Sequence, residues 1–122
     1  MVEKRAPRVK GWVGVDLDGT LVFYDKWRGE LHLGEPIWPM VERIKKILAD
    51  GQYDVRIFTA RVSTGTPAEI AVIAKNIQYY LEDRCKLPRL EVTCVKDYAM
   101  VLLYDDRCRQ VIHNMGVVIG EP

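Results

Sequence analysis

Short apolar runs alternate with stretches of helical periodicity along this chain. The four clearest runs predict buried strands and cover residues 12–17, 55–58, 91–95 and 100–104. Two weaker runs, at residues 110–113 and 116–119, predict further short strands near the end of the chain. The segments between these runs must therefore contain the elements that connect the strands.

Two stretches repeat apolar residues every three or four positions, which predicts helices with one buried face. The first stripe consists of Met40, Val41, Ile44, Ile47 and Leu48. Its helix should end at Asp50-Gly51, because glycine adopts the left-handed conformation that closes a helix. The second stripe consists of Ile70, Ile73, Ile77, Tyr80 and Leu81. A capping box at residues 66–69 begins this helix, which should end near residues 84–86. The order strand–helix–strand–helix–strand–strand predicts an α/β fold with a mostly parallel sheet.

The composition is that of one ordinary globular domain. The chain has 122 residues, of which 48% are hydrophobic and 29% charged, and its net charge is +1. This balance carries no strong nucleic-acid signature and no anionic-membrane patch. No apolar run approaches the ~18 residues that span a bilayer, and three cysteines without C-x-x-C spacing indicate free thiols in a reducing compartment. We therefore expect a cytoplasmic protein without a membrane partner, with a flexible tail at residues 1–10 and a single domain at residues 11–122.

Polar clusters follow four of the predicted strands. They are Asp16 with Asp18, Thr59 to Arg61, Lys96 with Asp97, and Asp105 with Asp106. In a parallel sheet the carboxyl ends of the strands share one edge, where ligands bind. Because side chains alternate along a strand, Asp16 and Asp18 should face the same side. Gly19 then lets the chain turn and brings backbone N–H groups to the same place. Such a group of carboxylate oxygens and backbone N–H donors suits a hard cation such as Mg²⁺ that is bound together with a phosphate.

Taken in order, these clusters resemble the four motifs of the haloacid dehalogenase (HAD) superfamily, whose members are mostly phosphotransferases. Asp16-Leu17-Asp18-Gly19-Thr20-Leu21 resembles the first motif, and Thr59 resembles the second. Lys96 is the best match to the third motif, and Asp105-Asp106 matches the fourth. The resemblance implies a three-layer, Rossmann-like core, and the outline is similar to small uncharacterised HAD-like proteins of bacteria and phages.

The resemblance also implies roles for the carboxylates. Asp16 would be the nucleophile that forms an aspartyl phosphate. Asp18 would be the general acid for the leaving group and then the base for water. Mg²⁺ would be held by Asp16, by the backbone carbonyl of Asp18 and by Asp105. Asp106 would be either a second ligand or an orienting hydrogen-bond acceptor.

Several polar residues would hold the phosphate or balance its charge. The resemblance assigns the phosphate oxygens to Thr59 and Lys96. Lys86 is the alternative lysine, although it falls at the end of a helix rather than a strand. Thr59 could instead be an ordinary cap residue. Arg61 and Arg107 could bind a substrate phosphate or carboxylate bidentately, or could brace the acidic site.

The loop at residues 23–38 bears on the choice of substrate. It is too short for the cap domain of many HAD enzymes, so we expect an open, capless site. Its aromatic and basic rim consists of Tyr24, Trp27, Arg28 and Trp38. The rim could stack on a base or a sugar, or its tryptophans could simply pack the loop onto the sheet. The expected substrate-binding residues are Gly19, Thr20, Ala60, Arg61, Trp27 and Arg28.

These expectations combine into a Mg²⁺-dependent phosphomonoester hydrolase. Its substrate would be a phosphorylated small molecule, a nucleotide or a polynucleotide end, and it would be a monomer or a weak dimer. The alternative is a non-catalytic module of the same fold that binds phosphate and Mg²⁺, or an enzyme that needs a partner to close its site. A phospho-acceptor receiver domain is disfavoured, because its acidic pair follows the first strand rather than the last.

Overall fold

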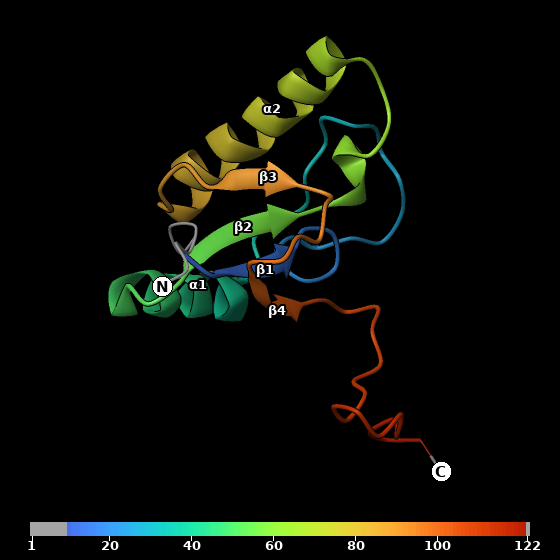
Figure 1. Ribbon diagram of the computed structural model, residues 1–122. Coiled ribbons are helices and arrows are strands. Elements are labelled where there is room, and N and C mark those ends of the chain that lie inside the picture. The colour runs from blue at the N-terminus through green and yellow to red at the C-terminus, as the bar shows by residue number, and fades with distance from the viewer. Residues whose placement is uncertain (1–9, 122) are drawn as a thin grey trace, which may run out of the picture.

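A four-stranded parallel sheet forms the centre of the computed structural model, which describes residues 10–121 (Figure 1). The strands are β1 (Trp12–Asp16), β2 (Asp54–Phe58), β3 (Glu91–Thr93) and β4 (Met100–Tyr104), in the order β3-β2-β1-β4. Every neighbouring pair is parallel. The predicted α/β fold with a parallel sheet is therefore confirmed, although β1 and β3 end earlier than the sequence indicates. All carboxyl ends point to one edge of the sheet (Figure 1).

Two helices connect the strands where the periodicity predicts them. The first, α1 (Trp38–Asp50), closes at Gly51, whose φ of 76° lies in the left-handed region. The second, α2 (Pro67–Cys85), begins with the predicted capping box, in which the side chain of Thr66 accepts a backbone hydrogen bond from the third helical residue. A short 3-10 helix, η1 (Ala60–Val62), follows β2 and is not predicted by the periodicity.

Both helices pack on the same face of the sheet. The buried residues of this face and of the two helices form one hydrophobic core that includes Val15, Ile57, Val41, Ile44, Ile73, Ile77 and Leu81. Two right-handed crossovers that proceed in the same direction across a sheet place their helices on one side. Residues 10–121 therefore form two layers, and the third layer that the family resemblance implies is absent from this part of the chain.

The connection between β3 and β4 covers part of the opposite face. Trp12, which is fully buried, donates a 2.7 Å hydrogen bond from its indole nitrogen to Asp97. The guanidinium group of Arg56 lies 3.1 Å from the same carboxylate and 4.6 Å from the centre of the Trp12 ring. The hydrogen bond from Trp12, together with the nearby Arg56, lowers the pKa of Asp97. Asp97 is thus bound at the amino end of β1, away from the edge where the other acidic clusters lie.

The loop between β1 and α1 is fixed at its base. The backbone N–H of Phe23 donates a 2.8 Å hydrogen bond to the carbonyl of Glu35. Gly34 packs so closely that a Cβ atom there would overlap the carbonyl oxygen of Phe23. The hydroxyl of Tyr80 on α2 donates a hydrogen bond to the carbonyl of Gly34, and burial raises the pKa of this phenol to about 12. The two ends of the loop are therefore held together and joined to α2.

The segment after β4 does not form the two strands predicted at residues 110–113 and 116–119. A single antiparallel bridge joins Val111 to Val118, and the segment runs away from the sheet (Figure 1). Its apolar side chains are exposed, for example 53% for Val111 and 67% for Met115. The prediction was wrong because an apolar run becomes a strand only beside an edge to which its backbone can bond, and this segment pairs only with itself in the described structure.

Three smaller expectations can also be compared with the structure. The three cysteines are free, with Cys85 buried, Cys94 half-buried and Cys108 exposed. Neither α1 nor α2 combines the length and the apolar content needed to cross a membrane, and the described residues contain no other long helix. The tail expected at residues 1–10 lies outside the described residues, apart from Lys10.

Candidate functional site

Three strand ends and the loop after β1 line one cavity. The parallel register places Asp16 beside Phe58 and Val15 beside Tyr104, so the residues that follow these strands meet at one edge. The cavity there has a volume of about 500 Å³. The sequence-predicted residues in its lining are Asp16, Asp18, Trp27, Thr59, Ala60, Arg61, Asp105 and Asp106. Most of the predicted site is therefore brought together.

Three carboxylates form a tight cluster at the carboxyl ends of β1 and β4. Asp16, Asp105 and Asp106 each place a carboxylate oxygen within 4.8 Å of the others. The pKa of Asp16 is raised to about 7, first by burial, then by the close carboxyl group of Asp106 and the negative charge of Asp105. Ionisation of Asp16 is thus opposed by its burial and by the two neighbouring carboxyl groups.

Thr20 and Gly19 hold this cluster together rather than facing a substrate. The hydroxyl of Thr20 lies 3.3 Å from a carboxylate oxygen of Asp16 and 3.3 Å from one of Asp106, so its proton can serve either. The same oxygen accepts a 3.1 Å hydrogen bond from the backbone N–H of Asp106. Gly19 has a φ of +86°, and a Cβ atom there would lie 2.5 Å from a carboxylate oxygen of Asp106.

Two of the backbone donors expected to face a ligand at this turn already have partners within the protein. The N–H of Gly19 donates to the carbonyl of Val22 at 2.8 Å, and the N–H of Thr20 lies 3.4 Å from the carbonyl of Leu17. Both donors are used to close the turn itself, so they are not free to bind a phosphate. Neither Gly19 nor Thr20 lines the cavity, and their assignment as substrate-binding residues is corrected accordingly.

Asp18 lies outside the carboxylate cluster and pairs with Arg61. Two guanidinium nitrogens of Arg61 donate 2.8 Å hydrogen bonds to the two oxygens of Asp18. The side chain of Arg61 is only 5% exposed, and that of Asp18 is 22% exposed. Of the two alternatives for Arg61, bracing the acidic site is the one observed. The side chain of Asp18 is therefore unavailable as a metal ligand in this arrangement, although its backbone carbonyl is not engaged by Arg61.

Thr59 and Ala60 follow β2 directly and both line the cavity. Thr59 is 2% exposed, and its hydroxyl oxygen accepts a 3.2 Å hydrogen bond from the backbone N–H of Arg61, as a cap of η1. Among the described residues this hydroxyl donates no hydrogen bond, and Thr59 also lines the cavity. Capping and phosphate binding are therefore compatible at this residue.

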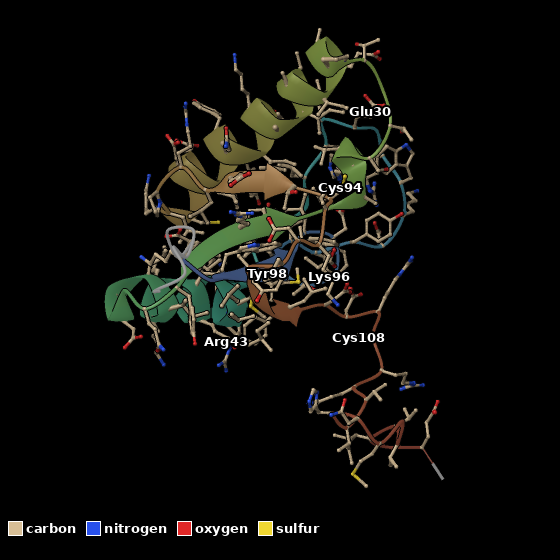
Figure 2. All side chains as sticks on the ribbon, in the orientation of Figure 1. Glu30, Arg43, Cys94, Lys96, Tyr98 and Cys108 are labelled. Atoms are coloured by element: carbon tan, nitrogen blue, oxygen red, sulfur yellow. The ribbon has the colours of Figure 1, made fainter. Side chains whose placement is uncertain are left out.

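Neither candidate lysine enters the lining of the cavity. Lys96 is exposed on the connection between β3 and β4 (Figure 2). Lys86 ends α2 in a left-handed conformation and precedes β3, at the opposite edge of the sheet. The cations that do line the cavity are Arg61 and Arg107. Within residues 10–121 Arg61 is paired with Asp18, whereas the guanidinium group of Arg107 makes no ion pair.

The loop contributes only part of its predicted rim. Trp27 lines the cavity, 55% exposed, and its ring centre lies 5.0 Å from the guanidinium carbon of Arg61. Arg28 makes a 2.8 Å ion pair with Asp25 and lines not this cavity but a neighbouring one that shares Asp18 and Arg61 with it. Trp38 is the first residue of α1 and does not line the cavity either.

Glu30 and Thr64 also line the cavity and were missed by the sequence reading. Glu30 lies on the loop near the amino end of α2 (Figure 2). Both residues stand in irregular segments without periodicity, so only the closure of the loop over the strand ends reveals them. They add one further carboxylate and one hydroxyl to the walls of the site.

Comparison of the chain with protein-family models, with curated proteins and with solved structures finds no match. The interpretation of the site therefore depends on the geometry described above. That geometry combines a carboxylate cluster, a separate carboxylate held by an arginine, a buried threonine hydroxyl and an unpaired arginine around one cavity. Such a set of groups can bind a hard cation and an anionic substrate side by side.

Proposed function

We propose that this chain is a Mg²⁺-dependent phosphomonoester hydrolase of HAD type that forms an aspartyl phosphate on Asp16. The observation that supports this most is the separation of two kinds of carboxylate in one cavity. Asp16 belongs to the cluster with Asp105 and Asp106, whereas Asp18 lies apart and pairs with Arg61. A hydrolase of this type needs a nucleophile beside a cation and a second carboxyl group for proton transfer.

The donor set of the carboxylate cluster fits Mg²⁺. Hard cations take oxygen ligands, and Mg²⁺ is commonly bound by one or two carboxylates together with phosphate oxygens. Asp16, Asp105 and Asp106 offer such oxygens within 4.8 Å of one another. Burial, the neighbouring carboxyl group of Asp106 and the charge of Asp105 raise the pKa of Asp16 to about 7, so a bound cation would offset the cost of ionising this carboxyl group. When bound, Mg²⁺ would neutralise charge on the cluster and on the phosphate oxygens.

The protein groups carry out two steps. In the first, a carboxylate oxygen of Asp16 attacks the phosphorus, and the bond to the ester oxygen breaks. The electron pair of that bond goes to the ester oxygen, which takes a proton from Asp18. In the second, a water oxygen attacks the phosphorus and gives a proton back to Asp18. Asp16 is released as a carboxylate and inorganic phosphate leaves.

Two further groups in the lining can hold the phosphate. The hydroxyl of Thr59 can donate a hydrogen bond, and the guanidinium group of Arg107 can offset negative charge in the place that the resemblance assigns to Lys96. Exposed aromatic rings of Tyr24 and Trp27 stand at the same cavity. Because any base can stack on such rings, nucleotides are the first substrates to test, ahead of sugar phosphates.

The test is phosphate release from an aryl phosphate and from a panel of nucleotides and sugar phosphates. Wild-type protein, Asp16→Asn and Asp83→Asn are each assayed with Mg²⁺ and with EDTA. Asp83 is an exposed carboxylate on α2 that does not line the cavity, so its variant is the matched control. We expect release that requires Mg²⁺ and is lost in Asp16→Asn but retained in Asp83→Asn.

A different result would favour the second candidate, a phosphate-binding and Mg²⁺-binding module. That module would bind Mg²⁺ through the carboxylate cluster, and Asp16→Asn would weaken the binding, yet no compound would be hydrolysed. Calorimetric titration with Mg²⁺ under the assay conditions separates this outcome from a protein that binds no cation at all.

A further inference from the structure

Arg61 joins three parts of the site that are far apart in the sequence. Its Nε and Nη2 atoms each donate a 2.8 Å hydrogen bond to Asp18. Its Nη1 atom donates to the backbone carbonyl of Glu30 at 2.8 Å and lies 3.4 Å from that of Gly29. The ring of Trp27 lies against the same guanidinium group. All three nitrogens are thus engaged by Asp18 or by the loop.

A planar guanidinium group is suited to this task because its donors have a fixed geometry. The Nε and Nη2 atoms hold both carboxylate oxygens of Asp18, and the Nη1 atom holds the carbonyl groups of the loop. With Arg61 5% exposed and Asp18 22% exposed, the ion pair is also shielded from water and salt more than a surface pair is. Movement of the loop and movement of Asp18 are therefore coupled through a single side chain.

Asn76 provides a comparison within the same loop. Its side-chain nitrogen donates a 3.0 Å hydrogen bond to the carbonyl of Leu31, next to the residues that Arg61 holds. Asn76 is half-buried on α2 and does not line the cavity. It holds the middle of the loop as Arg61 does, but it has no contact with Asp18.

We propose that Arg61 is a positioning residue that aligns Asp18 for proton transfer and fixes the loop at residues 23–37 over the site. This inference rests on the proposed function, because it assigns Asp18 the proton transfer of that reaction. In this proposal the loop takes the place of a cap domain. Because Arg61 contacts both the loop and Asp18, the loop is closed only when Asp18 is aligned. Removal of Arg61 should therefore impair mainly the step in which the leaving oxygen needs a proton.

Two substrates separate proton transfer from binding. The phenolate of an aryl phosphate leaves without protonation, whereas the alkoxide of an alkyl phosphate needs a proton. In Arg61→Gln we expect kcat/KM for the alkyl ester to fall by about 100-fold or more, and kcat/KM for the aryl ester to fall by less than about 10-fold. In Asn76→Ala both esters should be cleaved at close to the wild-type rate.

A second variant and a double mutant distinguish the positioning of Asp18 from a general loss of structure. Arg61→Lys keeps the charge but loses the paired N–H donors of the guanidinium group. We therefore expect an intermediate fall in kcat/KM that is again larger for the alkyl ester. Once Asp18 is replaced by Asn, the further change Arg61→Gln should cost little, because both variants remove the same function. Circular dichroism verifies that each variant is folded.

Each remaining outcome contradicts the inference in a recognisable way. Equal losses on both esters, seen as a raised KM, would mean that Arg61 binds the substrate anion. A gain on the alkyl ester would mean that Arg61 restrains Asp18 instead of aligning it. Equal losses in Arg61→Gln and Asn76→Ala would mean that only loop stability matters. Absence of Mg²⁺-dependent turnover in the wild type would instead overturn the proposed function itself.

Discussion

Replacement of Asp16 by Asn should stabilise the metal-free protein while it removes the proposed activity. In the folded state the pKa of Asp16 is about 7, against an ordinary value of 3.8. Folding therefore favours the protonated carboxyl group, and stability falls as the pH rises from about 4 to about 7, because the unfolded chain is already ionised there. Above pH 7 the folded protein carries the full cost of the ionised group. Asparagine has no charge to ionise and avoids this cost.

The size of the effect follows from the shift of about three pKa units. At about 1.4 kcal/mol per unit, a fully shielded group would cost ~4 kcal/mol. Asp16 is only half-buried, so solvent screening reduces the expected gain to about 1–2 kcal/mol. For a chain of this length this corresponds to a rise in Tm of about 4–8 °C.

The assay is thermal and urea unfolding of the wild type and Asp16→Asn in EDTA, at pH 8 and at pH 5. The variant should be clearly more stable at pH 8, and its advantage should shrink at pH 5, where the wild-type carboxyl group is protonated in the folded protein. Addition of Mg²⁺ at pH 8 should stabilise the wild type more than the variant, since ligand binding adds stability only where the site is intact. Asp83→Asn is the control, and its stability relative to the wild type should change neither with pH nor with Mg²⁺. Equal stability of the two proteins at pH 8, or an advantage that is the same at both pH values, would refute this reasoning.

Three further predictions concern single contacts. Gly19→Ala and Gly51→Ala both place a side chain at positive φ and should each lose about 1–2 kcal/mol of stability, but only Gly19→Ala meets Asp106; Mg²⁺ titration should therefore show weakened binding in Gly19→Ala alone. Arg107→Gln should raise KM for the phosphate ester more than Lys96→Met does, because only Arg107 lines the cavity; steady-state kinetics would contradict this if Lys96→Met had the larger effect. Thr66→Ala removes the cap of α2 and should cost about 1 kcal/mol in urea unfolding without a change in activity.

The elements that could be predicted from the sequence are those whose pattern and local chemistry agree. The helix α2 combines an apolar stripe with a capping box, and it begins and ends as predicted. The segment around Val111 and Val118 also contains apolar runs but lacks a partner edge, and it forms only one bridge. Periodicity records which side chains avoid water, whereas a strand also requires a neighbour that the pattern does not specify.

The layer arrangement illustrates the same limit on a larger scale. The alternation of strands and helices predicts a parallel sheet, but the faces that the helices cover depend on strand order. With β2 and β3 both added on the same side of β1, the two crossovers place α1 and α2 on one face. The other face is left to the β3–β4 connection, where Trp12 and Asp97 meet across 85 positions of sequence. No local signal indicates that contact.

The pairing of Asp18 with Arg61 could be predicted only in part from the sequence. Adjacent parallel strands that end level, at Asp16 and Phe58, bring the residues just beyond them together, so the closeness of Asp18 to Arg61 could have been derived from the predicted sheet. The choice of partner could not, because several carboxylates share that edge. In the folded structure Thr20 lies between Asp16 and Asp106, 3.3 Å from a carboxylate oxygen of each, whereas Asp18 pairs with Arg61. When several like groups share one edge of a sheet, their pairing depends on three-dimensional contacts such as those of Thr20, which no local pattern in the sequence indicates.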